Sequence, residues 1–285
     1  MRIDAALAWA TQQLEGGESP SVDAKVLLAH VLDTSQTYLF TWPDKTLSED
    51  AKTQFEQAIA RRQTGEPVAY IIGKRDFWTL SLQTSVHTLI PRPDTEVLVE
   101  TVLNWARQRQ AQVNKNDDVL TLCDLGTGTG AIALALASEL PTSRVTGVDF
   151  LEQAVQLAGQ NAKANHITNA HFLQSDWFSS LDNQRFDAIV SNPPYIEDSS
   201  PYLLEGDVRF EPSSALTSGE DGLEDIRHII ALAPKYLKEA GLLAFEHGFD
   251  QAAPVQALLQ QAGFEQVSTA KDYGGNDRVT WGVLC

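Results

Sequence analysis

The sequence predicts an α/β protein with a doubly wound, mostly parallel sheet that follows a small helical domain. In residues 96–284, apolar strand-like runs alternate with helical stretches of roughly 10–15 residues. Such alternation is typical of a parallel sheet covered by helices on both faces. Residues 2–62 show only helical spacing, and 43% of the chain is hydrophobic, which is enough for a full core.

The N-terminal part contains three predicted helices, at residues 2–15, 21–33 and 49–62, separated by "GGESPS" and "TWPDKT". Two strand-like segments follow, "VAYIIG" and "FWTLSLQTS", for which we expect a hairpin. We therefore place the domain boundary between residues 75 and 76, with a helical domain and linker at 1–75 and the hairpin at the start of 76–285.

Seven strands are expected in the second domain: "VLTLCDLG", "RVTGVDF", "AHFLQSDW", "FDAIV", "GLLAFEHG", "EQVSTAKDY" and "RVTWGVL". The helices between or before them are "EVLVETVLNWARQRQ", "AIALALASEL", "LEQAVQLAGQNAKAN", "EDIRHIIALAPKYL" and "AAPVQALLQQAG". This order predicts a seven-stranded sheet.

Bulk properties exclude several classes of protein. A net charge of -17 opposes non-specific attraction to phosphate backbones and anionic membranes, so neither DNA nor a membrane is an expected partner. Cys123 and Cys285 are too few for a disulfide framework or a zinc cluster, and the six histidines lack metal-site spacing, so no metal is expected. Without a signal peptide or a long apolar run, the chain is predicted to be cytoplasmic.

A glycine-rich loop, "DLGTGTGAIALA", links a predicted strand to a predicted helix. Glycines at 126, 128 and 130 permit positive φ and a close approach of ligand to backbone. Asp149 ends the next strand, where a carboxylate can accept the hydroxyls of a ribose. A tight structural turn and a dinucleotide site remain alternatives, but the combination favours a nucleoside site.

"QSDW" ends the third strand and offers two candidates for contact with a nucleobase. Asp176 can accept a hydrogen bond from an adenine amino group, and Trp177 can pack on the ring. A core or interface position is the alternative for Trp177.

The segment "FDAIVSNPPYI" places Asn192, Pro193, Pro194 and Tyr195 after the fourth strand. In an open α/β sheet, ligands bind at the carboxyl ends of strands where the strand order reverses, so this loop and the glycine loop should face one cavity. The Asn192 amide oxygen and the Pro193 carbonyl are two acceptors that match a planar –NH2 group, while Tyr195 can stack on it. Such a pocket suits methylation of a poorly nucleophilic nitrogen.

These motifs carry a family resemblance. "DLGTGTGAIALALA" with "SNPPYI" resembles class I S-adenosylmethionine-dependent methyltransferases that modify planar –NH2 nitrogens. "RRQTGEPVAYIIGKRDFW", "LIPRPDTE", "VRFEPSSAL" and "KDYGGNDRV" are similar to segments of the PrmC/HemK family, the N5-glutamine methyltransferases of peptide chain release factors. The resemblance covers essentially the whole chain.

The resemblance implies a Rossmann-like methyltransferase domain and an N-terminal domain that docks the release factor. It implies that S-adenosyl-L-methionine is the cofactor, that S-adenosyl-L-homocysteine is the product, and that the cofactor site comprises Gly126, Thr127, Gly128, Thr129, Gly130, Asp149 and Trp177. We add Asp176 and Asn192 to that site. Asn192, Pro193, Pro194 and Tyr195 would bind the glutamine of a Gly-Gly-Gln loop, with Asn192, Pro193 and Tyr195 as the catalytic residues. We expect a monomeric enzyme.

Rival functions share parts of this pattern. An N6-adenine DNA methyltransferase would share "NPPY", but it needs a basic surface that this acidic chain lacks. A ribosomal-protein glutamine methyltransferase keeps the chemistry, and only "VRFEP" favours release factors by analogy. A catalytically idle binding module is the third alternative.

The roles of four further residues stay open. Arg92 either lines the cofactor entrance or pairs with Glu96 at a helix start. Arg209 and Glu211 are expected to order the loop after "NPPY", with a direct substrate contact as the alternative. The single histidine of "EHG", His247, is expected to be structural.

Overall fold

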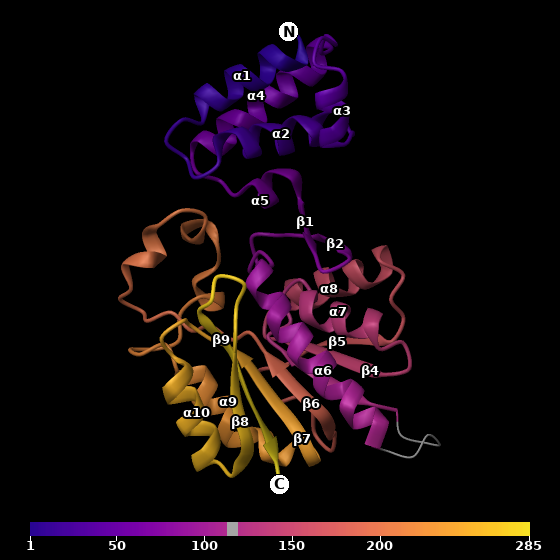
Figure 1. Cartoon of the computed structure of the whole chain (residues 1–285), viewed down its shortest axis with the longest axis vertical. Helices are drawn as coiled ribbons and strands as arrows, with labels where there is room; N and C mark the ends of the chain where they lie inside the picture. Colours follow the sequence, from indigo (N-terminus) through magenta and orange to yellow (C-terminus); the bar gives the residue numbers. More distant parts are fainter. Residues whose placement is uncertain (113–118) are drawn as a thin grey trace. The chain divides into compact units, whose positions relative to one another are not determined.

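The structure is a computed structural model that describes residues 1–112 and 119–285 (Figure 1). The chain divides into two compact units. The first comprises Met1–Lys74 and Leu204–Phe210, and the second comprises Arg75–Leu203 and Glu211–Cys285. The assignment of 204–210 to the first unit differs from the predicted boundaries, which cut the chain only once.

The first unit is a small helical bundle. Its helices are α1 (Ile3–Gln13), α2 (Pro20–Val31), α3 (Gln36–Thr41), α4 (Glu49–Gln63) and α5 (Val68–Ile72). The core contains Leu27 and Leu28 of α2 and Phe55 and Ile59 of α4, which lie at helical spacing on the inner faces of their helices.

Helices α3 and α5 were not expected. The side chain of Ser35 caps α3 by accepting a hydrogen bond from the Tyr38 amide. The prediction of a strand at "VAYIIG" is wrong, because α5 begins after Pro67 and ends at Gly73, whose φ of 73° is left-handed. A five-residue apolar run has no periodicity that would separate a short helix from a strand.

Residues 204–210 are held in the first unit by arginines at the end of α4. The Arg62 guanidinium donates to Asp23 Oδ2 (2.7 Å) and to Asp207 Oδ1 (2.8 Å). Arg209 in turn donates to the carbonyl of Thr64 (2.8 Å). A segment that follows "NPPY" in sequence is thus part of the helical unit.

The second unit contains the seven-stranded sheet, with strand order β5-β4-β3-β6-β7-β9-β8. Its strands are β3 (Thr121–Leu125), β4 (Arg144–Asp149), β5 (Ala170–Gln174), β6 (Phe186–Ser191), β7 (Leu237–Glu246), β8 (Phe264–Lys271) and β9 (Asp277–Leu284). β9 pairs antiparallel with β7 and β8, and the other pairs are parallel. The predicted doubly wound, mostly parallel sheet is confirmed.

Helices cover both faces of this sheet (Figure 1). They are α6 (Glu96–Gln112), α7 (Ala131–Glu139), α8 (Glu152–Ala164), α9 (Glu224–Leu232) and α10 (Ala252–Gln261). Alternate strand residues serve the two cores: Leu122 and Ala188 pack with α6 and α7, whereas Cys123 and Ile189 pack with α9 and α10. Strands buried on both faces explain the continuous apolar runs in the sequence.

A two-stranded sheet, β1 (Lys74–Phe77) and β2 (Leu80–Gln83), precedes the larger one. Asn161 of α8 and Asn165, the residue that caps the end of this helix, satisfy the backbone of β2. Asn161 accepts from the Gln83 amide (2.8 Å), and Asn165 donates to the Ser81 carbonyl (3.0 Å). Among the described residues, no helix is both long enough and apolar enough to span a membrane.

Candidate active site

The reversal of strand order lies between β3 and β6, and two of the predicted loops meet there. Leu125, the last residue of β3, is in register with Ser191, the last residue of β6. The glycine loop therefore starts beside "NPPY", as the sequence predicts. A cavity of about 260 Å³ opens at this edge, and the predicted site residues among its walls are Gly126, Thr127, Gly128, Thr129, Asp149, Asp176, Trp177, Asn192 and Pro194.

The glycine loop has a backbone that other residues adopt only with strain. Gly126, Gly128 and Gly130 have φ values of 71°, 55° and 83°. Gly130 lies next to α8 as well, since a Cβ there would be 3.1 Å from the Cβ of Ala158. Gly130 does not line the cavity, so its role is to let the loop turn into α7.

Asp124, near the end of β3, fixes the glycine loop by hydrogen bonds and was not predicted as a site residue. Its Oδ2 accepts hydrogen bonds from the Thr127 hydroxyl (2.6 Å) and from the Ala133 amide (3.2 Å). Its Oδ1 is buried without a partner among the described residues. Burial raises the pKa of Asp124 to about 7, against these hydrogen bonds. A carboxylate directly before a glycine loop was the available signal.

Asp149 is fixed at the end of β4 by the backbone around it. Oδ2 accepts from the Gly128 amide and Oδ1 from the Leu151 amide, each at 2.9 Å. Burial raises the pKa of Asp149, and the backbone hydrogen bonds oppose that rise. Each carboxylate oxygen keeps a further lone pair for a ligand hydroxyl.

Trp177 and Asp176 lie on the wall formed by the end of β5. The Trp177 ring lies beside Gly126, since a Cβ added there would be 3.7 Å from the ring. Trp177 is partly buried against the core and also lines the cavity, so its position fits a core residue while contact with a nucleobase stays a prediction. Asp176 is exposed at the cavity wall.

The residues of "NPPY" fall into two groups. Asn192 and Pro194 line the cavity, whereas Pro193 and Tyr195 are not among its walls. Asn192 Nδ2 donates to Thr95 Oγ1 at 3.4 Å, and its Oδ1 is buried with no hydrogen-bond partner within the described ranges. An unpaired buried acceptor is rare and needs an explanation.

Tyr195 faces a buried glutamate that the sequence analysis passed over. The Tyr195 hydroxyl donates to Oε1 of Glu246 (3.3 Å), the last residue of β7. Burial, followed by the negative charge of Glu246, raises the pKa of the Tyr195 hydroxyl. The backbone of Tyr195 is fixed as well, because its carbonyl accepts from Gln251 Nε2 (3.0 Å).

Arg92 lines the cavity, and its ion pair is with Glu211 of "VRFEP". The pairing with Glu96 considered from the sequence is wrong, since Glu96 instead accepts the Trp78 amide (2.9 Å). Glu211 also accepts from the Ile90 amide (3.2 Å) and is buried. It therefore joins the loop after "NPPY" to the segment before α6, as expected for an ordering role.

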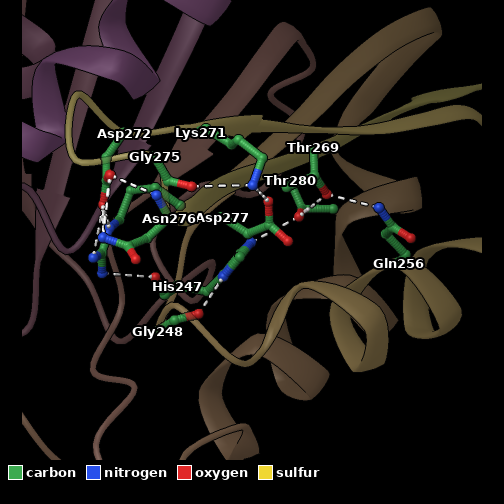
Figure 2. A network of polar contacts seen from close by, with 11 residues as sticks. His247, Gly248, Gln256, Thr269, Lys271, Asp272, Gly275, Asn276, Asp277 and Thr280 are labelled. Atoms are coloured by element: carbon green, nitrogen blue, oxygen red, sulfur yellow. Dashed lines mark hydrogen bonds and ion pairs between the residues drawn. The ribbon is translucent and has the colours of Figure 1, made fainter.

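His247 belongs to a polar network with the turn between β8 and β9 (Figure 2). Its Nδ1 lies 2.8 Å from the Gly248 carbonyl, which only accepts, so Nδ1 carries the proton and Nε2 accepts from Thr280 Oγ1 (2.7 Å). Burial lowers the pKa of His247 and so favours this neutral form. Both ring nitrogens of His247 form hydrogen bonds within the protein, as expected for a structural role.

Arg278 is the second centre of the same network. Its guanidinium donates to Asp272 Oδ2 from Nε (3.1 Å) and Nη2 (3.0 Å), and from Nη1 to the His247 carbonyl (3.2 Å). In the part of the chain that the structure describes, no group of three His, Cys, Asp or Glu side chains could hold a metal ion.

The sheet order, the glycine loop and the cavity define a class I methyltransferase, and comparisons with known proteins agree. A family model for a methyltransferase domain matches residues 116–278. A crystal structure of the hMettl16 catalytic domain with a MAT2A 3'UTR hairpin has a TM-score of 0.57 at 13% identity and covers 90% of each chain. The human methyltransferase 10 domain containing protein has a TM-score of 0.53 at 17% identity, over 73% of this chain and 89% of that one. At these identities the likeness shows the fold.

The chain belongs to the family of release factor glutamine methyltransferases. A model of the PrmC N-terminal domain matches residues 5–73. The Vibrio cholerae release factor glutamine methyltransferase is 53% identical over 98% of this chain and 96% of its own length. The Escherichia coli protein of the same name is 46% identical over 96% and 95%.

Proposed function

We propose that this protein transfers a methyl group from S-adenosyl-L-methionine to the side-chain amide nitrogen (N5) of the glutamine in the Gly-Gly-Gln motif of peptide chain release factors. Several relatives that are about 50% identical and align over nearly the whole chain are named release factor glutamine methyltransferase. The observation that carries the chemistry is the buried, unpaired Asn192 oxygen beside the glycine-loop cavity.

The residues around the cavity fit the cofactor. The glycine loop leaves its backbone open to a ligand, and Asp149 keeps acceptor capacity for ribose hydroxyls. Trp177 offers a ring face and Asp176 an acceptor for an adenine base. Asp149, Asp176 and Asp225 of α9 all line the cavity and, among the described residues, outnumber its one arginine, Arg92, which favours a cofactor with a cationic sulfur. When bound, S-adenosylmethionine supplies an electrophilic methyl group, whose S–C bond breaks as the N–C bond to the amide forms and one amide proton is released.

Asn192 and Pro193 are proposed to hold the glutamine amide. Its two hydrogens need two acceptors, which are the Asn192 oxygen and the Pro193 carbonyl. Within residues 1–112 and 119–285, no hydrogen bond to the Pro193 carbonyl is found, and both prolines lack an amide that could occupy a neighbouring acceptor. Fixing the planar –NH2 group in advance removes orientational entropy from the activation step, which lowers the free-energy barrier by roughly several kcal/mol.

The two acceptors also act on charge. An amide nitrogen is a poor nucleophile because its lone pair is delocalised, and it becomes positive as a methyl group adds. Acceptors that are fixed before the reaction stabilise that positive charge without reorganisation. Tyr195 and Pro194 would pack on the flat amide and exclude water from it.

The rival functions are less well supported. RsmC of T. thermophilus, a 16S rRNA methyltransferase solved with AdoMet and guanosine, is 22% identical and covers 74% of this chain at a TM-score of 0.50, so it shares the fold only. A nucleic-acid substrate would meet a chain of net charge -17. A ribosomal-protein substrate would conflict with the names of the full-length relatives. A cytoplasmic location, a monomeric enzyme and the absence of a metal requirement stay predictions.

Peptide mass spectrometry tests the proposal. The enzyme is incubated with S-adenosylmethionine and, in parallel, an unmodified release factor, large-subunit ribosomal protein and duplex DNA. We expect one added methyl group on the Gly-Gly-Gln glutamine and none on the other substrates. Methylation of the ribosomal protein or of adenine instead would overturn the substrate assignment while keeping the cofactor.

A further inference from the structure

Glu246 is a buried acid that the proposed reaction does not yet use. It ends β7, and its side chain is 1% exposed. Oε1 accepts from the Tyr195 hydroxyl (3.3 Å), whereas Oε2 is buried without a partner among the described residues. A carboxyl with one unpaired oxygen is costly to bury, so its position needs an explanation.

Thr95 connects Glu246 to Asn192. Thr95 is 4% exposed in the short 3-10 helix Pro93–Thr95, and its hydroxyl lies beside the Glu246 carboxyl, where it lowers the pKa of that group while Oε2 stays without a close hydrogen bond. The same hydroxyl lies 3.4 Å from Asn192 Nδ2. One carboxyl thus meets both ends of "NPPY": Asn192 through Thr95, and Tyr195 directly.

The direction of these hydrogen bonds follows from the inventory of donors. An ionised carboxylate only accepts, so the single hydroxyl hydrogen of Thr95 points to Glu246. The Thr95 oxygen is then left to accept, and it takes a hydrogen from the Asn192 –NH2 group. The Asn192 oxygen consequently turns away from Thr95 and stays unpaired, which is the orientation found.

Two charges and two neighbouring hydroxyls act on the buried Glu246 carboxyl. Burial raises its pKa to about 7, Arg278 of β9 and the hydrogen bonds from Thr95 and Tyr195 lower it, and Asp94 raises it. Arg278 is itself held by Asp272 (3.0 Å) and by the His247 carbonyl (3.2 Å). Arg278, the second residue of β9, therefore supplies the positive charge that favours the carboxylate.

We propose that Glu246 is a positioning residue of the methyl transfer: its carboxylate, through the Thr95 hydroxyl, sets the orientation in which the Asn192 oxygen accepts from the substrate amide. The same carboxylate holds the Tyr195 hydroxyl, so both side chains of the motif are fixed by one group. This inference rests on the proposed function, because it assigns the Asn192 oxygen to the glutamine –NH2 group.

Glu246→Gln is the decisive variant, since it keeps size and shape. If the glutamine oxygen accepts from Tyr195, its –NH2 group faces Thr95 and donates to it. The Thr95 hydroxyl then turns its hydrogen toward Asn192, whose amide must flip to present its oxygen there. We expect kcat to fall roughly 10- to 100-fold, with little change in KM for the release factor or in the affinity for S-adenosylhomocysteine measured by calorimetry.

Thr95 offers a matched pair of variants. Thr95→Val removes the hydroxyl with nearly the same shape and is expected to lower kcat as Glu246→Gln does. Thr95→Ser keeps the hydroxyl and is expected to restore most of kcat. Equal loss in both, or in neither, would overturn the relay, and this comparison stands even if Glu246→Gln fails to fold.

The ionisation of the Glu246 carboxyl can be measured directly, without relying on activity. Infrared titration of protein labelled with carbon-13 glutamate should show one carboxyl that ionises near pH 7 in the wild type and is missing in Glu246→Gln. The rate should rise with pH over the same range, and this limb should be lost in the variant. An unchanged kcat in Glu246→Gln, with wild type active on release factors, would overturn this inference alone. A wild type that does not methylate release factors would instead overturn the proposed function.

Discussion

Replacing Asn192 with alanine should separate activity from stability. The side chain makes one long hydrogen bond, 3.4 Å to Thr95, and buries an oxygen without a partner. Losing the first costs little, and removing the second relieves a desolvation penalty of about 1–3 kcal/mol. We therefore expect the free energy of unfolding of Asn192→Ala to be unchanged or raised by about 1 kcal/mol.

The effect on catalysis should be much larger. Removing one of the groups that stabilise charge in a transition state typically lowers kcat by about 10²–10³-fold. In the proposed site the main contacts of the cofactor are with the glycine loop and Asp149, so we expect its affinity to change by less than about tenfold. Steady-state kinetics on a release factor, calorimetry with the cofactor and urea unfolding measure the three quantities on one preparation.

Ser191→Ala is the matched control from the preceding residue. Ser191 Oγ donates to the Leu125 carbonyl at 2.8 Å within the buried sheet, so its loss should lower the free energy of unfolding by about 1 kcal/mol. Turnover should be largely retained. If Asn192→Ala lost stability like Ser191→Ala, or kept its turnover, the assignment of the Asn192 oxygen as a substrate acceptor would be refuted.

Other residues of the site give predictions that single measurements check. Asp149→Ala should weaken cofactor binding by roughly 10- to 100-fold in calorimetry, and unchanged affinity would discard the ribose assignment. Gly147→Ala would place a Cβ 2.6 Å from Phe172 and 2.7 Å from Thr127 Oγ1, so the melting temperature and the cofactor affinity should both fall. Because the fold raises the pKa of Asp124 from 3.8 to about 7, folding favours the protonated carboxyl. The free energy of unfolding that this contributes is fully present below pH 3.8 and is lost as the pH rises through about 7. Urea unfolding should show that loss between about pH 4 and pH 8 in the wild type and less of it in Asp124→Asn; equal loss would contradict the assignment.

The parts of the fold that the sequence predicted are those with strong local patterns. Strands buried on both faces are continuous apolar runs, and Leu122, Cys123 and Leu125 of β3 are fully buried as that pattern requires. The glycine loop and "NPPY" could be brought together because parallel strands present their carboxyl ends at one edge. Neither step needs knowledge of distant contacts.

The parts that were missed depend on tertiary contacts. Helix α5 reads like a strand because its five residues are too few for periodicity, and its ends are set by Pro67 and Gly73. Residues 204–210 belong to the first unit because Arg62 binds Asp207 across 145 positions of sequence. Glu246 and Thr95 gain their roles only from the partners that the fold brings to them.

The unpaired polar atoms also show where this fold gives up stability. In the described ranges, the buried side-chain atoms without a partner are Asp124 Oδ1, Asn192 Oδ1 and Glu246 Oε2. They lie near the ends of β3, β6 and β7, which are consecutive in the sheet. Each costs about 1–3 kcal/mol, and their gathering at one edge is what an active site requires, because groups that are satisfied within the protein have no capacity left for a substrate. The same edge carries the glycine loop and the cavity, so the least satisfied part of the core is also the part to which we assign the cofactor and the substrate.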